Sequence, residues 1–135
     1  MPPYKIVLAE DHIRFREIIK KIIEGNGELT VVGEANDGLE LLELLKQSLP
    51  DMFITDISMP RLRGLEAAKR VKELYSQIKV LILTAHNGKD FLDQAISNGV
   101  DGYILKQEMD EELYPAIQAV RSGKFYISPL LEANP

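Results

Sequence analysis

Met52-Phe53-Ile54-Thr55-Asp56, residues 52–56, is a short apolar run that ends in a carboxylate. Its length and its aromatic and β-branched side chains are typical of a β-strand. An apolar run without alternating polar residues indicates a strand that is buried on both faces, as in parallel sheets covered by helices. The run therefore predicts a strand of a parallel sheet with Asp56 at its carboxyl end.

Comparable apolar runs lie on both sides of this one, and longer segments of helical period separate them. Such an alternation is typical of βα units built around a parallel sheet. We therefore predict an α/β fold with five such units, written (βα)5. The predicted strands are Lys5–Ala9, Thr30–Glu34, Met52–Asp56, Val80–Thr84 and Gly102–Leu105.

The segments between these strands carry apolar residues three and four positions apart, which predicts helices with one face in the core. Gly99 and Gly123 end two of the segments, at positions where a left-handed helix cap is expected. The apolar positions are Phe15, Ile18, Ile19, Ile22 and Ile23; Leu41, Leu42, Leu45 and Leu49; Leu65, Ala68, Val71 and Leu74; Phe91, Leu92, Ala95 and Ile96; and Leu113, Ala116, Ile117 and Val120.

Length and composition predict one soluble, cytoplasmic domain. The chain has 135 residues, of which 45% are hydrophobic and 27% charged, and it has no cysteine, which excludes a disulfide scaffold and a Cys-ligated metal site. No apolar run approaches the ~20 residues of a membrane span, so no membrane association is expected. The formal net charge of -5 repels phosphate backbones, so contact with DNA is expected only through another domain.

Polar side chains follow four of the five predicted strands. Glu10 and Asp11 follow the first strand, Asp56 ends the third, Thr84 ends the fourth and Lys106 follows the fifth. If the second strand, which has no such residue, lies at an edge, the strand order is 2-1-3-4-5, that of a doubly wound, flavodoxin-like sheet. The first and third strands are then neighbours, and their three carboxylates share one pocket.

Three neighbouring carboxylates repel one another unless a cation neutralises them. Oxygen-only ligands suit Mg²⁺, which takes one or two carboxylates and completes its shell with water and phosphate. A carboxylate can act as the nucleophile toward a phosphoryl group, and Asp56 is the central candidate. Lys106 would then supply an ammonium group and Thr84 a hydroxyl donor to the phosphoryl oxygens.

The chain resembles a bacterial response-regulator receiver domain from about Tyr4 to Gly123. The motifs that carry the resemblance are Glu10-Asp11, Phe53-Ile54-Thr55-Asp56-Ile57-Ser58-Met59-Pro60 with Gly64, Leu83-Thr84-Ala85, and Gly102-Tyr103-Ile104-Leu105-Lys106. Five elements in the right order and spacing make the match specific. The resemblance implies a receiver domain over residues 4–123.

The resemblance also implies roles for single residues. Asp56 would accept a phosphoryl group from a sensor histidine kinase, and phosphorylation and dephosphorylation of this residue would be its only chemistry. Asp11, Asp56 and the backbone carbonyl of Ser58 would ligate Mg²⁺, while Glu10 would act mainly through water. Thr84 and Tyr103 would form the switch that reshapes the surface of the last helices.

The end of the chain, Arg121-Ser122-Gly123-Lys124-Phe125-Tyr126-Ile127-Ser128-Pro129, is similar to receivers that precede a LuxR-type helix-turn-helix domain. Residues 124–135 are therefore expected to be a linker or tail, with the DNA-binding output domain absent from this chain. The resemblance to such transcriptional regulators implies a homodimer that forms on phosphorylation. A stand-alone receiver that acts through protein contacts is the alternative.

One departure from the family pattern is Gln107, which follows Lys106 where many receivers have proline. A cis bond before a residue other than proline costs about 3–4 kcal/mol, so the Lys106–Gln107 bond is expected to be trans. Ile13 lies opposite the core stripe of the first helix, beside the pocket, where it would suit docking of the kinase.

Taken singly, these residues have ordinary structural interpretations. Asp56 could cap a turn, Glu10 and Asp11 could favour a helix N-terminus, Thr84 could be an ordinary strand residue and Lys106 a solvated charge. Independent roles do not explain why all of them fall at one predicted sheet edge. Their common position favours one functional site.

Two other function classes use parts of this pattern. A Mg²⁺-dependent phosphohydrolase of the haloacid-dehalogenase type has an aspartate nucleophile but expects a second aspartate two residues later, where this chain has Ser58. A flavodoxin-like cofactor binder expects a phosphate-binding loop after the first strand, where Glu10 and Asp11 would repel phosphate. The receiver is therefore the favoured interpretation.

Overall fold

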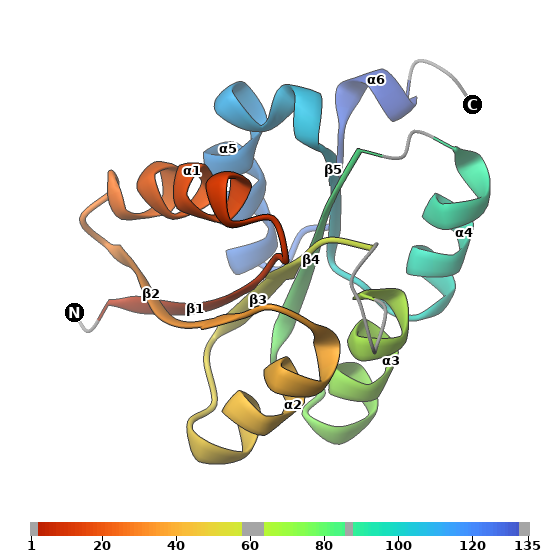
Figure 1. Cartoon of the computed structure of the whole chain (residues 1–135). Coiled ribbons are helices and arrows are strands. Elements are labelled where there is room, and N and C mark those ends of the chain that lie inside the picture. The colour runs from red at the N-terminus through yellow and green to blue at the C-terminus, as the bar shows by residue number, and fades with distance from the viewer. Residues whose placement is uncertain (1–2, 58–63, 86–87, 133–135) are drawn as a thin grey trace.

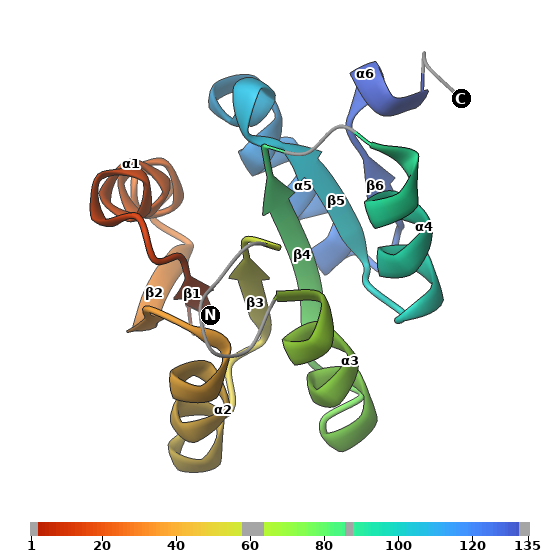
Figure 2. The same cartoon turned by 45° about the vertical axis from the view of Figure 1, so that its right-hand side comes forward.

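The computed structural model describes residues 3–57, 64–85 and 88–132. They form one parallel sheet with the strand order β2-β1-β3-β4-β5-β6 (Figure 1; all six strands are labelled in Figure 2). The order of the first five strands confirms the predicted doubly wound, flavodoxin-like α/β fold. The strands are β1 (Tyr4–Ala9), β2 (Leu29–Ala35), β3 (Met52–Thr55), β4 (Lys79–Thr84), β5 (Gly102–Leu105) and β6 (Tyr126–Ile127).

Helices cover both faces of the sheet (Figure 2). One face packs against α1 (Ile13–Glu24) and α5 (Met109–Arg121), and the other against α2 (Gly38–Gln47), α3 (Gly64–Leu74) and α4 (Lys89–Ser97). Two short helices, η1 (Lys106–Glu108) and α6 (Pro129–Glu132), follow β5 and β6. Of the helices in the described ranges, none has the length and apolar composition needed to cross a bilayer.

Side chains alternate between two hydrophobic clusters along each central strand. In β1, Ile6 and Leu8 belong to the cluster that includes α1 and α5, whereas Val7 and Ala9 belong to the cluster with α2, α3 and α4. All four side chains of β3 are buried. The continuous apolar runs of the sequence are thus explained by burial of the sheet on both faces.

Four apolar residues that the sequence pattern placed on the core faces are exposed instead. They lie at the margins of the helical stripes or just beyond a helix end, where periodicity alone does not reveal how far a neighbouring element extends. These residues are Ile18, Leu49, Leu74 and Ile96. The glycine caps are confirmed, since Gly99 and Gly123 have φ values of 82° and 92°.

The sixth strand was not among the five predicted, and it lies within residues 124–135, which the sequence analysis assigned to a linker or tail. Tyr126 and Ile127 pair in parallel with Gly102 and Tyr103 of β5. Beyond the strand, Ser128 is fully buried and Leu131 joins the same hydrophobic cluster as Tyr103. A two-residue strand is too short to produce a recognisable alternation, so its pairing depends on contacts made only in the folded chain.

Ser128→Ala is expected to lower the free energy of unfolding by about 1–3 kcal/mol, because it leaves a buried backbone donor without its acceptor. The Ser128 hydroxyl accepts a hydrogen bond from the Leu105 N–H at 2.9 Å. Urea unfolding measures the effect. Ser122→Ala is the matched control, since the exposed Ser122 hydroxyl donates to the Ala119 carbonyl at the end of α5 and takes part in no buried contact that the described residues show. Equal stability of the two variants would contradict the prediction.

Candidate functional site

The carboxylates of Glu10, Asp11 and Asp56 lie together at the carboxyl edge of β1 and β3. One carboxylate oxygen from each residue lies within 4.8 Å of the others. Glu10 and Asp56 are only 1% and 9% exposed, whereas Asp11 is exposed and leaves the cluster open to solvent. The structure therefore brings together the three residues that the sequence predicted to share a pocket.

Lys106 links two of these carboxylates. Its ammonium nitrogen lies 2.5 Å from Glu10 Oε1 and 3.2 Å from Asp56 Oδ2. The same nitrogen lies 4.4 Å from the centre of the Phe15 ring, at the distance of a cation–π contact. Lys106 begins η1, and its bond to Gln107 is trans as predicted. The side chain thus reaches from the end of β5 across to β1 and β3.

The acidic cluster carries an excess of negative charge, because Lys106 supplies one ammonium group against three carboxylates. Burial is the main effect on Glu10 and raises its pKa above the usual value. The negative charge of Asp56 acts in the same direction, while the hydrogen bond and the positive charge of Lys106 partly offset the rise. An oxygen-only donor set with uncompensated charge fits Mg²⁺ and offers nothing that favours a soft metal. Glu10, Asp11 and Asp56 are the described residues that could hold the ion. The expected carbonyl ligand Ser58 lies outside the described residues.

The backbone around Asp56 is fixed on both sides. The Asp56 N–H donates to the Ala9 carbonyl at 3.2 Å, and the Thr55 hydroxyl donates to the Asp56 carbonyl at 3.0 Å. The Gly64 N–H donates to the Ile57 carbonyl at 2.9 Å, which brings the start of α3 against this segment. Asp56 is thereby held at one place relative to β1.

Thr84 and Tyr103 lie on the two strands beyond β3. Thr84 ends β4, is fully buried, and is paired with Leu105, the residue before Lys106. Tyr103 lies on β5 and is fully buried with its ring in the cluster formed with α2, α3 and α4. The structure therefore places Thr84 at the predicted edge and Tyr103 inside the fold.

Tyr103→Phe is expected to raise the free energy of unfolding by about 1 kcal/mol, because the Tyr103 hydroxyl is buried and accepts or donates no hydrogen bond within the described part of the chain. Burial, together with the charge of Asp56, raises the pKa of Tyr103 from 10.0 to about 12. The folded state thus favours the neutral phenol. The contribution of this group to the free energy of unfolding is fully present below pH 10 and is lost as the pH rises toward 12.

Urea unfolding at pH 7 and at several values between pH 9 and pH 12 measures both effects. The variant should be more stable at pH 7 and should lose stability less steeply above pH 10. A Phe variant that is less stable than wild type at pH 7 would show that the hydroxyl has a stabilising partner.

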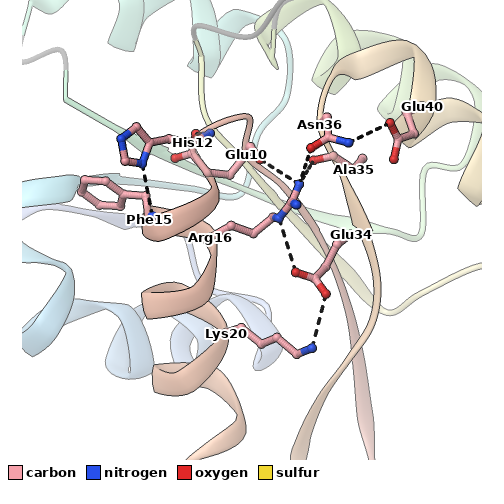
Figure 3. Close-up of polar contacts among 9 residues, drawn as sticks. All are labelled: Glu10, His12, Phe15, Arg16, Lys20, Glu34, Ala35, Asn36 and Glu40. Carbon is pink, nitrogen blue, oxygen red and sulfur yellow. Dashed lines mark hydrogen bonds and ion pairs between the residues drawn. The ribbon is translucent and has the colours of Figure 1, made fainter.

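The start of α1 contains site residues that the sequence analysis did not find. His12 is exposed and caps α1, since its Nδ1 accepts a hydrogen bond from the Phe15 N–H at 3.3 Å. Arg16 donates to the backbone carbonyl of Glu10 (Figure 3). No sequence signal marks a side chain whose partners are backbone carbonyls. Ile13 is 60% exposed at the same helix end, as the docking hypothesis requires.

Comparison with known families gives one match over most of the chain. The family model described as "Response regulator receiver domain" matches residues 6–118. This range contains every residue discussed above as a site candidate.

Comparison with individual proteins agrees with this match. The chain is 34% identical over 130 residues to the transcriptional regulatory protein DegU of Brevibacillus brevis, covering 96% of this chain and 55% of that protein. A solved LuxR-family response regulator from Aurantimonas sp. SI85-9A1 has a TM-score of 0.93 and 31% identity, covering 97% of this chain and 94% of that one.

A second solved structure is the isolated receiver domain of RcsB from Salmonella enterica serovar Typhimurium in the presence of phosphomimetic BeF3-. Its TM-score is 0.91 and its identity 26%, with 97% of each chain covered. The chain is also 38% identical over 131 residues to the oxygen regulatory protein NreC of Staphylococcus carnosus, covering 96% of this chain and 60% of that protein. It thus spans 55% of the length of DegU and 60% of that of NreC.

Proposed function

Because the chain belongs to the response regulator receiver domain family, we propose that it acts in phosphorelay signalling and that Asp56 accepts a phosphoryl group from a sensor histidine kinase. The observation that carries the proposal is the convergence of Glu10, Asp11, Asp56 and Lys106 at one sheet edge. Three chain segments, the ends of β1, β3 and β5, contribute to this arrangement, and an ordinary cap or surface ion pair does not require it.

The reaction is a phosphoryl transfer between two side chains. A carboxylate oxygen of Asp56 attacks phosphorus, the new O–P bond forms as the P–N bond of the phosphohistidine breaks, and the histidine ring leaves. Lys106, already beside Asp56 Oδ2, would pair with a phosphoryl oxygen, and the Thr84 hydroxyl would donate to another. The phosphoryl group would be added to and removed from the Asp56 carboxylate alone, so the protein would not turn over external substrates.

Glu10, Asp11 and Asp56, with the Ser58 carbonyl, would hold Mg²⁺. The bound ion would screen and orient the charged phosphoryl oxygens during transfer. Asp11 is exposed, so an ion and its waters can enter from solvent. Glu10 is the most deeply buried of the three and would act mainly through a metal-bound water.

The output is proposed to be a conformational change that controls transcription. Thr84 and Tyr103 would form the switch, and the phosphorylated protein would form a homodimer. DNA would be contacted through a LuxR-type output domain outside residues 4–123, since relatives such as DegU are transcriptional regulators. A cytoplasmic location follows from such a role. A stand-alone receiver acting through protein contacts is the alternative, and assay of DNA binding by the intact gene product separates the two.

Treatment with acetyl phosphate and Mg²⁺, followed by intact mass spectrometry, tests the proposal. We expect one added phosphoryl group per chain, stable in acid and labile in base, and no label when a chelator replaces Mg²⁺. A protein that stays unlabelled with Mg²⁺, or that is labelled equally with the chelator, would overturn the proposal.

A further inference from the structure

Arg16 joins three chain segments, one of which carries Glu10 of the acidic cluster (Figure 3). Its Nη1 donates to the Glu10 carbonyl at 3.1 Å, to the Ala35 carbonyl at 3.3 Å and to Asn36 Oδ1 at 2.7 Å. Its Nε lies 3.4 Å from Glu34 Oε1, and the side chain is only 15% exposed. One guanidinium group on α1 therefore connects the end of β1, the end of β2 and the segment that leads into α2.

The Glu10 carbonyl that Arg16 holds belongs to a residue of the acidic cluster. The Glu10 N–H donates to the Ala35 carbonyl at 3.0 Å, and Arg16 links the Glu10 carbonyl to the same Ala35 carbonyl. The peptide groups on both sides of Glu10 are therefore connected to the end of β2. The Glu10 carboxylate contacts Lys106. Fixing the backbone of Glu10 also fixes the start of the next residue, Asp11.

Arginine suits this position because its planar fork presents several N–H donors in a fixed geometry, whereas lysine presents a single flexible ammonium group. Arg16 contacts the carbonyl of Glu10 and not its carboxylate. Arg16 therefore affects the acidic cluster by fixing the position of the Glu10 backbone.

We propose that Arg16 is a positioning residue, which holds the connection from β1 to α1 so that Glu10 and Asp11 stand at metal-binding distance from Asp56. The inference rests on the proposed Mg²⁺ site. It concerns a residue that touches neither the ion nor the phosphoryl group.

A charge-matched pair of variants tests the proposal. Arg16→Met removes the guanidinium, and Lys20→Met removes the other α1 cation that pairs with Glu34, at 3.3 Å, without any contact to Glu10 among the described residues. Each variant loses one positive charge. Long-range electrostatics alone predicts that either loss makes the pocket bind a cation more tightly. Loss of positioning predicts weaker binding in Arg16→Met only.

Mg²⁺ affinity is measured by calorimetric titration of the metal into the 135-residue protein and each variant, far below the unfolding temperature. We expect Arg16→Met to weaken binding about 10-fold, as loss of groups that orient metal ligands does, Arg16→Lys to weaken it less, and Lys20→Met to match wild type or bind slightly more tightly. The amide NMR shifts of Glu10, Asp11 and His12 should change in Arg16→Met and stay near wild type in Lys20→Met.

Equal Mg²⁺ affinity in folded Arg16→Met and Lys20→Met would overturn the role of Arg16 and leave the proposed function intact. Failure of the wild-type protein to bind Mg²⁺ would instead overturn the proposed site, and this inference with it. Should Arg16→Met not fold, Arg16→Lys decides in its place: weaker binding by the folded variant supports the proposal, and wild-type affinity overturns it.

Discussion

Asp56→Asn is expected to abolish the phosphoryl label that acetyl phosphate and Mg²⁺ give to the wild-type protein. An amide has no anionic oxygen to attack phosphorus, so the variant lacks the nucleophile although its side chain keeps nearly the same shape. The other carboxylates nearby would not replace it, because Glu10 is buried against Lys106 and Asp11 lies on a different strand end. Intact mass spectrometry of the two proteins under the same conditions measures the effect.

Asp51→Asn is the matched control, because Asp51 stands just before β3, at the opposite end of the strand that leads to Asp56. Its carboxylate accepts a hydrogen bond from the Lys5 N–H at 2.8 Å and has no part in the proposed site. The control should label like wild type. Urea unfolding should show that Asp56→Asn is folded, since the change removes one charge from a crowded acidic pocket. A label that persists in Asp56→Asn would place the nucleophile elsewhere.

The convergence around Asp56 could be predicted because parallel strands end at a common edge. Once β1 and β3 were recognised as neighbours, the positions of Glu10, Asp11 and Asp56 followed from the strand ends alone. Lys106 could be placed by the same reasoning at the end of β5. These features depend on strand boundaries, which apolar runs reveal, and on strand order, which the absence of a polar residue after the second strand indicated.

Features that depend on single tertiary contacts could not be predicted in this way. Strand β6 is defined by backbone pairing with β5 and by the buried Ser128, and neither leaves a periodic pattern in the sequence. Arg16 looks like an ordinary helix-surface cation until the carbonyls of Glu10 and Ala35 are placed beside it. Hydrophobic periodicity reports which face of an element is buried, but not which polar group a side chain reaches.

Gly64→Ala is expected to lower the free energy of unfolding by about 3 kcal/mol or more, because the start of α3 leaves no room for a side chain. A Cβ atom at this position would lie 1.8 Å from the Asp56 carbonyl oxygen and 3.1 Å from the Ile57 Cα. These are backbone atoms, which cannot turn away as the end of a flexible side chain can. Either α3 or the segment that carries Asp56 must therefore move.

Two measurements separate this effect from a general loss of a glycine. Gly27→Ala is the control, since a Cβ at Gly27 meets no described atom within 4 Å, and its stability should stay within about 0.5 kcal/mol of wild type. Phosphorylation by acetyl phosphate should also be slower in Gly64→Ala than in Gly27→Ala at a temperature where both are folded, because relief of the clash displaces Asp56 from Lys106. If Gly64→Ala kept the stability and labelling rate of wild type, α3 could shift away from β3 without displacing Asp56. The close approach of Gly64 would then be a matter of helix packing alone, independent of the site.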